Sequence, residues 1–150
     1  MSLLDANQPE PSKTPRYIIL GVIAAFVIAF LIWHHVRYDA EKKVAAEFFS
    51  ALESGDLQQA YKLWQPAADY SFKDFQQDWG PNGFIGPIKS FKVEYAEAPR
   101  KSLTSVAVRV LVSPYAPLPK SSDPRASKTR SVVIWVNRNS HSLSTPPPAY

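Results

Sequence analysis

An uninterrupted apolar stretch near the amino end dominates the hydropathy pattern of the chain. Tyr17 to Trp33 contains no charged or amide side chain over 17 residues. An α-helix of that length spans about 26 Å, close to the roughly 30 Å hydrocarbon thickness of a bilayer. A helix also satisfies its own backbone hydrogen bonds in lipid. The pattern therefore predicts a transmembrane helix over residues 17–36, preceded by a disordered, Pro-containing tail over residues 1–16.

The apolar stretch has the features of a retained anchor. No small-x-small cleavage site follows Trp33, which favours an uncleaved anchor over a removed signal peptide. Gly21, Ala25 and Ala29 recur every fourth residue and share one side of the helix. Such a stripe allows two helices to approach closely, although small residues are common in any spanning helix. We take this stripe as a candidate dimer face of the anchor.

Basic residues flank the predicted anchor on both sides, so they bear on its orientation. Lys13 and Arg16 precede it, and Arg37, Lys42 and Lys43 follow it. The count is nearly balanced, but large domains cross largely regardless of their charge, and a short basic tail commonly stays in the cytoplasm. We expect a cytoplasmic N-terminus and an exported C-terminal domain.

After the anchor the apolar residues recur with a helical period. Val44, Phe48 and Leu52 recur at every fourth position, which indicates a first amphipathic helix. Asp39 is a candidate N-cap for this helix, and Gly55 is expected to end it. Asp56 is then placed to cap a second helix, which ends before Pro66.

A third short helix and a glycine-rich loop are predicted next. Ser71 and Asp74 have the spacing of a capping box. The loop that follows contains Gly80, Gly83 and Gly86, but a phosphate-binding motif needs a strand before it and a helix after it, and the order here is reversed. We interpret the loop as a helix-to-strand connection that carries Phe84 and Ile85 into the core.

From residue 91 the apolar period falls to two, which is typical of β-strands. Strands are predicted near residues 91–95, 103–113 and 129–137, with a long Pro-containing loop over residues 114–127. The first strand is expected to place Phe91, Val93 and Tyr95 on one face. The order of elements predicts an α+β domain over residues 37–139, with about three helices on an antiparallel sheet. Residues 140–150 are rich in proline and predict an extended tail.

The helical hairpin carries a resemblance to a known family. Residues 48–61 read FFSALESGDLQQAY, an aromatic-rich helix followed by a Gly-Asp turn. This stretch resembles the opening of the nuclear transport factor two-like (cystatin-like) superfamily, although only three strands are evident where that family usually has four or more. The resemblance covers residues 39–137. It implies a cone whose helices pack on a curved sheet around a cavity, which serves as an active site in some members and as core in others. It also implies a convex sheet face that often dimerises.

Several aromatic residues are candidates for lining such a cavity. They are Tyr61, Trp64, Trp79 and Tyr95. Aromatic residues at helical and strand spacing are more often core than ligand site, and core is the preferred reading. Asp69, Asp74 and Asp78 are the acids that could approach such a cavity, but they lack a recognisable catalytic spacing. We assign no catalytic residue.

One face of the predicted sheet is a candidate partner surface. Trp135 and Val133 point away from the apolar set formed by Val132, Ile134 and Val136. Ala107 and Leu111 on the neighbouring strand extend this second apolar face. Such a face needs a partner, a dimer or cover from the chain itself.

Composition narrows the chemistry further. The chain has no cysteine, and its three histidines, His34, His35 and His141, have no metal-ligand spacing, so no metal or cofactor is expected. Residues 39–79 hold eight acids and four bases, whereas residues 80–150 hold ten bases and three acids. The basic residues near the long loop are interleaved with Ser, Pro and Ala and not with stacking aromatics, so we expect no nucleic-acid partner. Solvated charge or attraction to anionic lipid headgroups is the preferred reading.

Together these patterns predict a single-pass membrane protein that presents a small, non-catalytic interaction or assembly domain. Its expected partners are the lipid bilayer and either a second copy or another membrane-complex subunit. The alternative is a membrane-tethered enzyme or small-ligand binder that uses the cavity between helices and sheet.

Overall fold

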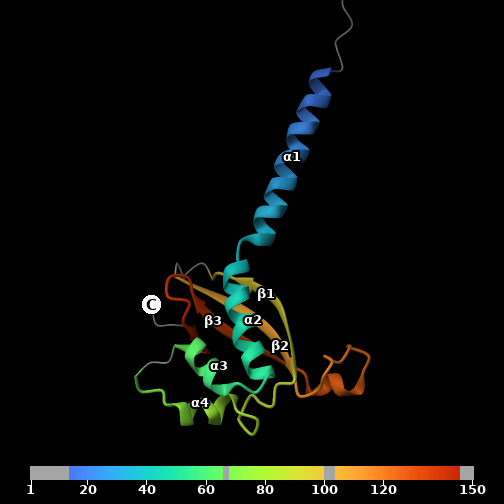
Figure 1. The fold of residues 1–150 in the computed structure, drawn as a ribbon. Coiled ribbons are helices and arrows are strands. Elements are labelled where there is room, and N and C mark those ends of the chain that lie inside the picture. The colour runs from blue at the N-terminus through green and yellow to red at the C-terminus, as the bar shows by residue number, and fades with distance from the viewer. Residues whose placement is uncertain (1–13, 66–67, 100–103, 146–150) are drawn as a thin grey trace, which may run out of the picture. The chain divides into compact units, whose positions relative to one another are not determined.

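The computed structural model describes residues 14–65, 68–99 and 104–145, and its elements belong to two compact units that divide between Arg37 and Tyr38 (Figure 1). The first unit contains helix α1, Thr14–Val36, of 23 residues. Among the described residues it is the one helix long and apolar enough, by length and composition, to cross a membrane. At its carboxyl end the Arg37 guanidinium lies 5.0 Å from the Trp33 ring centroid. Aromatic and basic residues of this kind are typical of membrane interfaces. The predicted tail lies outside the described residues, apart from its last three.

The second unit begins with the predicted helical hairpin. Helix α2 spans Asp39–Glu53; Tyr38 is its N-cap and Asp39 is its first helical residue, so the prediction that Asp39 caps the helix is wrong by one residue. The turn between the helices uses Gly55 at φ 79°, a left-handed conformation that glycine adopts without steric cost. Asp56 accepts a hydrogen bond from the Gln59 amide at 2.9 Å and caps helix α3, Leu57–Trp64, as predicted.

Helix α4, Phe72–Trp79, begins at the predicted capping box of Ser71 and Asp74. The glycine loop then turns back against the end of this helix. A Cβ atom at Gly83 would overlap the Gln77 carbonyl oxygen, so only glycine permits this close approach. The amides of Phe84 and Ile85 donate to the carbonyls of Gln77 and Asp78, both at 2.9 Å. These bonds are consistent with the structural reading of the loop, because they engage amides that a phosphate cradle would leave free. The prediction that Phe84 enters the core is wrong, since its side chain is 82% exposed, whereas Ile85 packs against the core.

The chain ends in an antiparallel sheet with strand order β1-β2-β3-β4, which confirms the α+β class. The strands are β1 Ser90–Glu97, β2 Ser105–Ser113, β3 Arg130–Asn137 and β4 Leu143–Ser144. A 3₁₀ helix, Pro124–Lys128, interrupts the predicted long loop. Strand β4 lies within the stretch for which the sequence predicted an extended tail. Leu143 is buried there and pairs with Val136, because its apolar side chain completes the core.

The helices cover one face of this sheet, with α2 lying across the strands (Figure 1). The covered face is built from alternate valines of β2 and from Ile134 and Val136 of β3, all of which are buried. Phe49 of α2 meets Phe91 of β1, with ring centroids 5.8 Å apart. The core therefore lies between α2 and the sheet, and α3 and α4 close its side through aromatic rings.

A partly buried ion pair joins the beginning of α2 to the residue that follows β3. The Arg138 Nε atom lies 3.4 Å from Glu41 Oε1, and Glu41 is 8% exposed. The Arg138 guanidinium also lies over the Tyr38 ring, 5.5 Å from its centroid. Periodicity did not predict this contact, since the two charged residues are distant in sequence.

Candidate functional site

The two tryptophans expected to line a cavity lie in the aromatic core. Trp64 is 6% exposed and Trp79 is 2% exposed. Their ring centroids are 5.3 Å apart, and each lies about 5 Å from the Phe48 ring. Rings at these distances are in direct contact. The space between helices and sheet is thus occupied at this point by the side chains themselves.

Tyr61 and Tyr95, the other two candidates, lie in different parts of the domain. Tyr61 is half-buried, and its hydroxyl donates to the Tyr70 carbonyl at 2.7 Å. Tyr95 is 43% exposed. The prediction that Tyr95 shares a face with Val93 is wrong, because a β-bulge between these residues shifts the register by one and turns the tyrosine to the other face. The structure brings Tyr61, Trp64 and Trp79 into one cluster and leaves Tyr95 outside it.

Two of the three acidic residues near this cluster are engaged in local hydrogen bonds. The Tyr70 hydroxyl donates to Asp78 Oδ2 at 2.6 Å. Burial, and then this bond to Asp78, raise the pKa of Tyr70 well above its ordinary value. The third acid, Asp69, is exposed. Each contact holds the chain between α3 and α4 in place and has no need of a substrate.

The Ser71–Asp74 box gives a pH prediction. The Ser71 hydroxyl and amide donate to Asp74 Oδ2 at 2.6 and 3.1 Å, and they lower the pKa of Asp74. The box therefore stabilises the fold above the unfolded-state pKa of Asp, about 3.9, and this contribution is lost as the pH falls through the lower folded-state pKa. We expect Ser71→Ala to raise the pKa of Asp74 toward its ordinary value, as measured by carbon NMR of the carboxyl group.

A second carboxylate serves as the control for that titration. The Arg125 side chain and amide lower the pKa of Asp123, far along the chain from Ser71. This pKa should stay unchanged in Ser71→Ala. An unchanged Asp74 pKa in Ser71→Ala would contradict the assignment of the shift to the Ser71 hydroxyl.

The four residues of the candidate partner face lie on the sheet face opposite the helices. Strand register pairs Ala107 with Trp135 and Arg109 with Val133, and it places Leu111 in the next row of the same face. Leu111 and Trp135 are half-buried, Val133 is 37% exposed, and Ala107 is 6% exposed. Through the bulge, Tyr95 of β1 joins this face beside Arg109. We call the set Tyr95, Ala107, Arg109, Leu111, Val133 and Trp135 the outer sheet face.

Arg109 belongs to the outer sheet face, although the sequence pattern did not identify it as a candidate site residue. Its guanidinium lies over the Tyr95 ring, 5.1 Å from the centroid. Its Nε atom is buried and has no hydrogen-bond partner among the described residues. A buried donor without an acceptor costs free energy. The Nε atom is enclosed by the chain itself, so an acceptor on another molecule would meet Arg109 at the exposed part of this half-buried side chain. Alternation along β2 placed Arg109 on this face, but only the bulge on β1 shows that it meets an aromatic ring.

The remaining candidates from the sequence are the small residues of the anchor and the histidines considered as metal ligands. Gly21, Ala25 and Ala29 are exposed residues of α1, and the helix places them on one stripe. His34 and His35 are also in α1, but their side chains lie outside the described part of the structure. Within the described ranges no group of three His, Cys, Asp or Glu side chains could hold a metal ion.

Comparisons with family models, with curated proteins and with solved structures gave no match. The function is therefore argued from the geometry of the chain itself.

Proposed function

We propose that this chain is a single-pass membrane protein whose domain is a non-catalytic assembly module that pairs with a second copy of itself. In this proposal α1 is the anchor and the outer sheet face is the contact. The domain is a cone-like member of the nuclear transport factor two-like superfamily, in which helices pack on a curved sheet. The helical hairpin with its Gly-Asp turn, now joined by a fourth strand, supports that membership.

The outer sheet face is the observation that carries the proposal. It combines apolar side chains, namely Leu111, Val133 and Trp135, with the half-buried cationic side chain of Arg109. Tryptophan, tyrosine and arginine are the residues that contribute most to binding at protein interfaces. A face of this composition is suited to a protein partner, because water solvates its apolar part poorly and the guanidinium can pair with a carboxylate of that partner.

Charge complementarity favours a second copy as the partner. Glu97 is exposed on the same face as Arg109, since it pairs with Ala107 in the next row. In a two-fold dimer the same surface is used twice. An axis that runs midway between these two positions places Glu97 of one copy opposite Arg109 of the other. Each dimer then forms this ion pair twice, and a shared membrane would raise the local concentration of both copies.

Two features of the anchor support the remaining parts of the proposal. The stripe of Gly21, Ala25 and Ala29 permits close approach of two anchors. Lys13 and Arg16 precede the apolar stretch, and a short basic tail of this kind favours a cytoplasmic N-terminus with an exported domain.

A charge-swap experiment on the full chain in lipid vesicles tests the dimer. Donor and acceptor dyes are attached to Ser121→Cys, an exposed position in a chain without native cysteine, and energy transfer is followed as lipid is added. We expect Arg109→Glu to weaken association about tenfold or more, because it brings two carboxylates together. Adding Glu97→Arg should restore association, since the pair is then reversed. Trp135→Ser should weaken it about 30-fold, the effect of a hot-spot residue.

Lys120→Glu is the matched control, since it makes the same charge change at an exposed loop position away from the outer sheet face. It should leave energy transfer unchanged. If Arg109→Glu and Trp135→Ser both associate as strongly as the natural chain, the proposal loses its basis. The α1 stripe would then be the remaining contact.

The alternative function is a membrane-tethered enzyme or small-ligand binder that uses a cavity between helices and sheet. It has less support, because Trp64 and Trp79 fill that space and the nearby acids serve as helix cap and tyrosine acceptor.

A further inference from the structure

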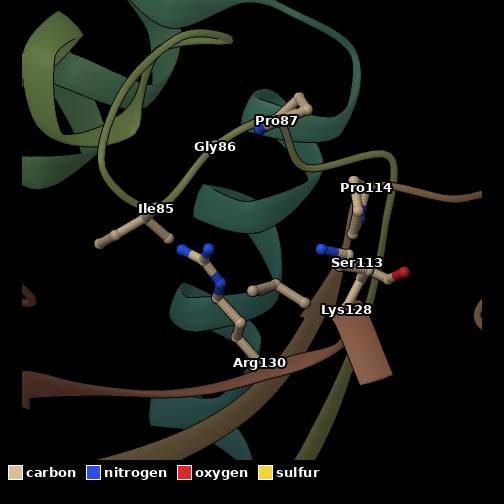
Figure 2. Close-up of a pocket in the computed structure, with 8 residues that line it drawn as sticks. Ile85, Gly86, Pro87, Ser113, Pro114, Lys128 and Arg130 are labelled. Atoms are coloured by element: carbon tan, nitrogen blue, oxygen red, sulfur yellow. The ribbon is translucent and has the colours of Figure 1, made fainter. Parts of the chain in front are cut away.

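A small pocket lies at the end of the sheet where β2 and β3 meet the glycine loop (Figure 2). Its volume is about 120 Å³, well below the roughly 300–1,000 Å³ of sites that hold drug-sized ligands. Three segments that are distant in sequence form its wall: Ile85, Gly86 and Pro87; Val112, Ser113 and Pro114; and Lys128 and Arg130. The pocket is separate from the outer sheet face, and the inference below is independent of the proposed dimer.

The glycine loop gives this pocket a fixed wall. A Cβ atom at Gly86 would overlap the Gly80 carbonyl oxygen, so the backbone passes too close there for any other residue. Just before it, the Ile85 amide donates to the Asp78 carbonyl at 2.9 Å. On the opposite side the Lys89 amide donates to the Ser113 carbonyl at 2.8 Å. The pocket is therefore preformed, which lowers the entropy cost of binding a ligand.

Two cations converge on the pocket. Figure 2 shows the Arg130 side chain extending from β3 toward the loop that carries Ile85, with Lys128 beside it. One Arg130 terminal nitrogen donates to the Phe84 carbonyl at 2.9 Å, which fixes the guanidinium and leaves its other N–H groups available. The described lining contains no acidic residue. Asp123, the one acid between residues 114 and 128, is held by Arg125 at 2.7 Å.

The rest of the lining favours one ligand chemistry. Ile85, Pro87, Val112 and Pro114 are apolar, and poorly hydrated surroundings strengthen the attraction between a cation and an anion. Ser113 is 1% exposed, and its oxygen accepts from the Tyr115 amide at 3.2 Å; Figure 2 shows this oxygen on the side away from Arg130, so the hydroxyl belongs to the wall and not to the binding groups. A fixed guanidinium and an ammonium group are the donors that recognise a phosphate group.

We propose that this pocket binds a single phosphate group, held by Arg130 and Lys128. The group can come from a free phosphate or from the headgroup of an anionic phospholipid. Both sources offer an anionic phosphate with terminal oxygens that accept charge-assisted hydrogen bonds.

Titration calorimetry on the full chain in neutral detergent micelles tests the site with two probes, at constant ionic strength. The probes are inorganic phosphate and a water-soluble phosphatidic acid with six-carbon chains. NMR of the Arg130 Nε–H group reports whether binding is local. We expect saturable binding of at least one probe and a shift of this signal. Arg130→Gln and Lys128→Gln should each weaken binding about tenfold or more, since each removes a charge-assisted hydrogen bond.

Lys120→Gln is the control, because it removes one exposed positive charge outside the pocket lining. Its binding should match that of the natural chain. Saturation with phosphate supports a soluble ligand, and saturation with phosphatidic acid alone supports a lipid headgroup. Absence of saturation with both probes, or equal weakening in Lys120→Gln, would overturn the proposal. All three variants should keep the energy transfer of the dimer assay, so failure here is distinguishable from failure of the assembly proposal.

Discussion

Replacing Phe48 with alanine is expected to lower the free energy of unfolding of the domain by about 3–5 kcal/mol, the usual cost of truncating a buried aromatic residue. Phe48 is fully buried, and its ring lies between 5.0 and 6.2 Å from the rings of four other aromatic residues. Two of these, Trp64 and Trp79, lie on different helices, so the truncation leaves a cavity that no single helix can fill by shifting. Urea unfolding of the full chain in micelles, followed by tryptophan emission, measures the change.

Phe84 offers a control with the same chemical change. Its side chain is 82% exposed, so Phe84→Ala should alter the free energy of unfolding by less than about 0.5 kcal/mol. Equal effects at the two positions would show that Phe48 is not the centre of the core.

The second large effect is expected in the anchor. Lysine at the centre of a membrane-spanning helix costs roughly 2.5–3.5 kcal/mol, so Ile23→Lys with Val27→Lys should cost about 5–7 kcal/mol of insertion free energy. Both positions are near the middle of α1, Thr14–Val36. We expect the natural chain to stay in the membrane pellet after alkaline carbonate extraction and the double variant to move largely to the supernatant.

The matched control places two lysines at exposed positions of the domain, Gln58→Lys with Gln76→Lys. This variant should remain in the pellet. A natural chain that leaves the pellet without detergent would contradict the anchor itself.

Single cysteines then report the orientation, because the chain has none of its own. In intact cells a membrane-impermeant maleimide should label Ser121→Cys but not Ser2→Cys. The reverse pattern would place the domain in the cytoplasm and leave the anchor prediction unaffected.

Local signals account for the elements that the sequence predicted well. The Asp56 cap, the left-handed Gly55 and the Ser71–Asp74 box each depend on residues within four positions of one another. Helix α1 was equally visible, since the absence of charge over a long stretch needs no information from the rest of the fold.

Long-range pairing explains the elements that were missed or misplaced. The bulge after Val93 depends on how β1 meets β2, and it moved Tyr95 from the expected cavity to the outer sheet face. Strand β4 is only two residues long, so alternation could not identify it. Its place depends on the pairing of Leu143 with Val136.

The amino-acid sequence by itself determined the apolar helix, the caps of α3 and α4 and the α+β order of elements, because periodicity and capping act over a few neighbouring residues. Tertiary structure alone decided that Arg109 meets Tyr95 and that Arg130 reaches the loop beside Ile85. Those contacts join residues 14 and 45 or more positions apart, so they depend on strand register and loop packing, which a local pattern does not specify.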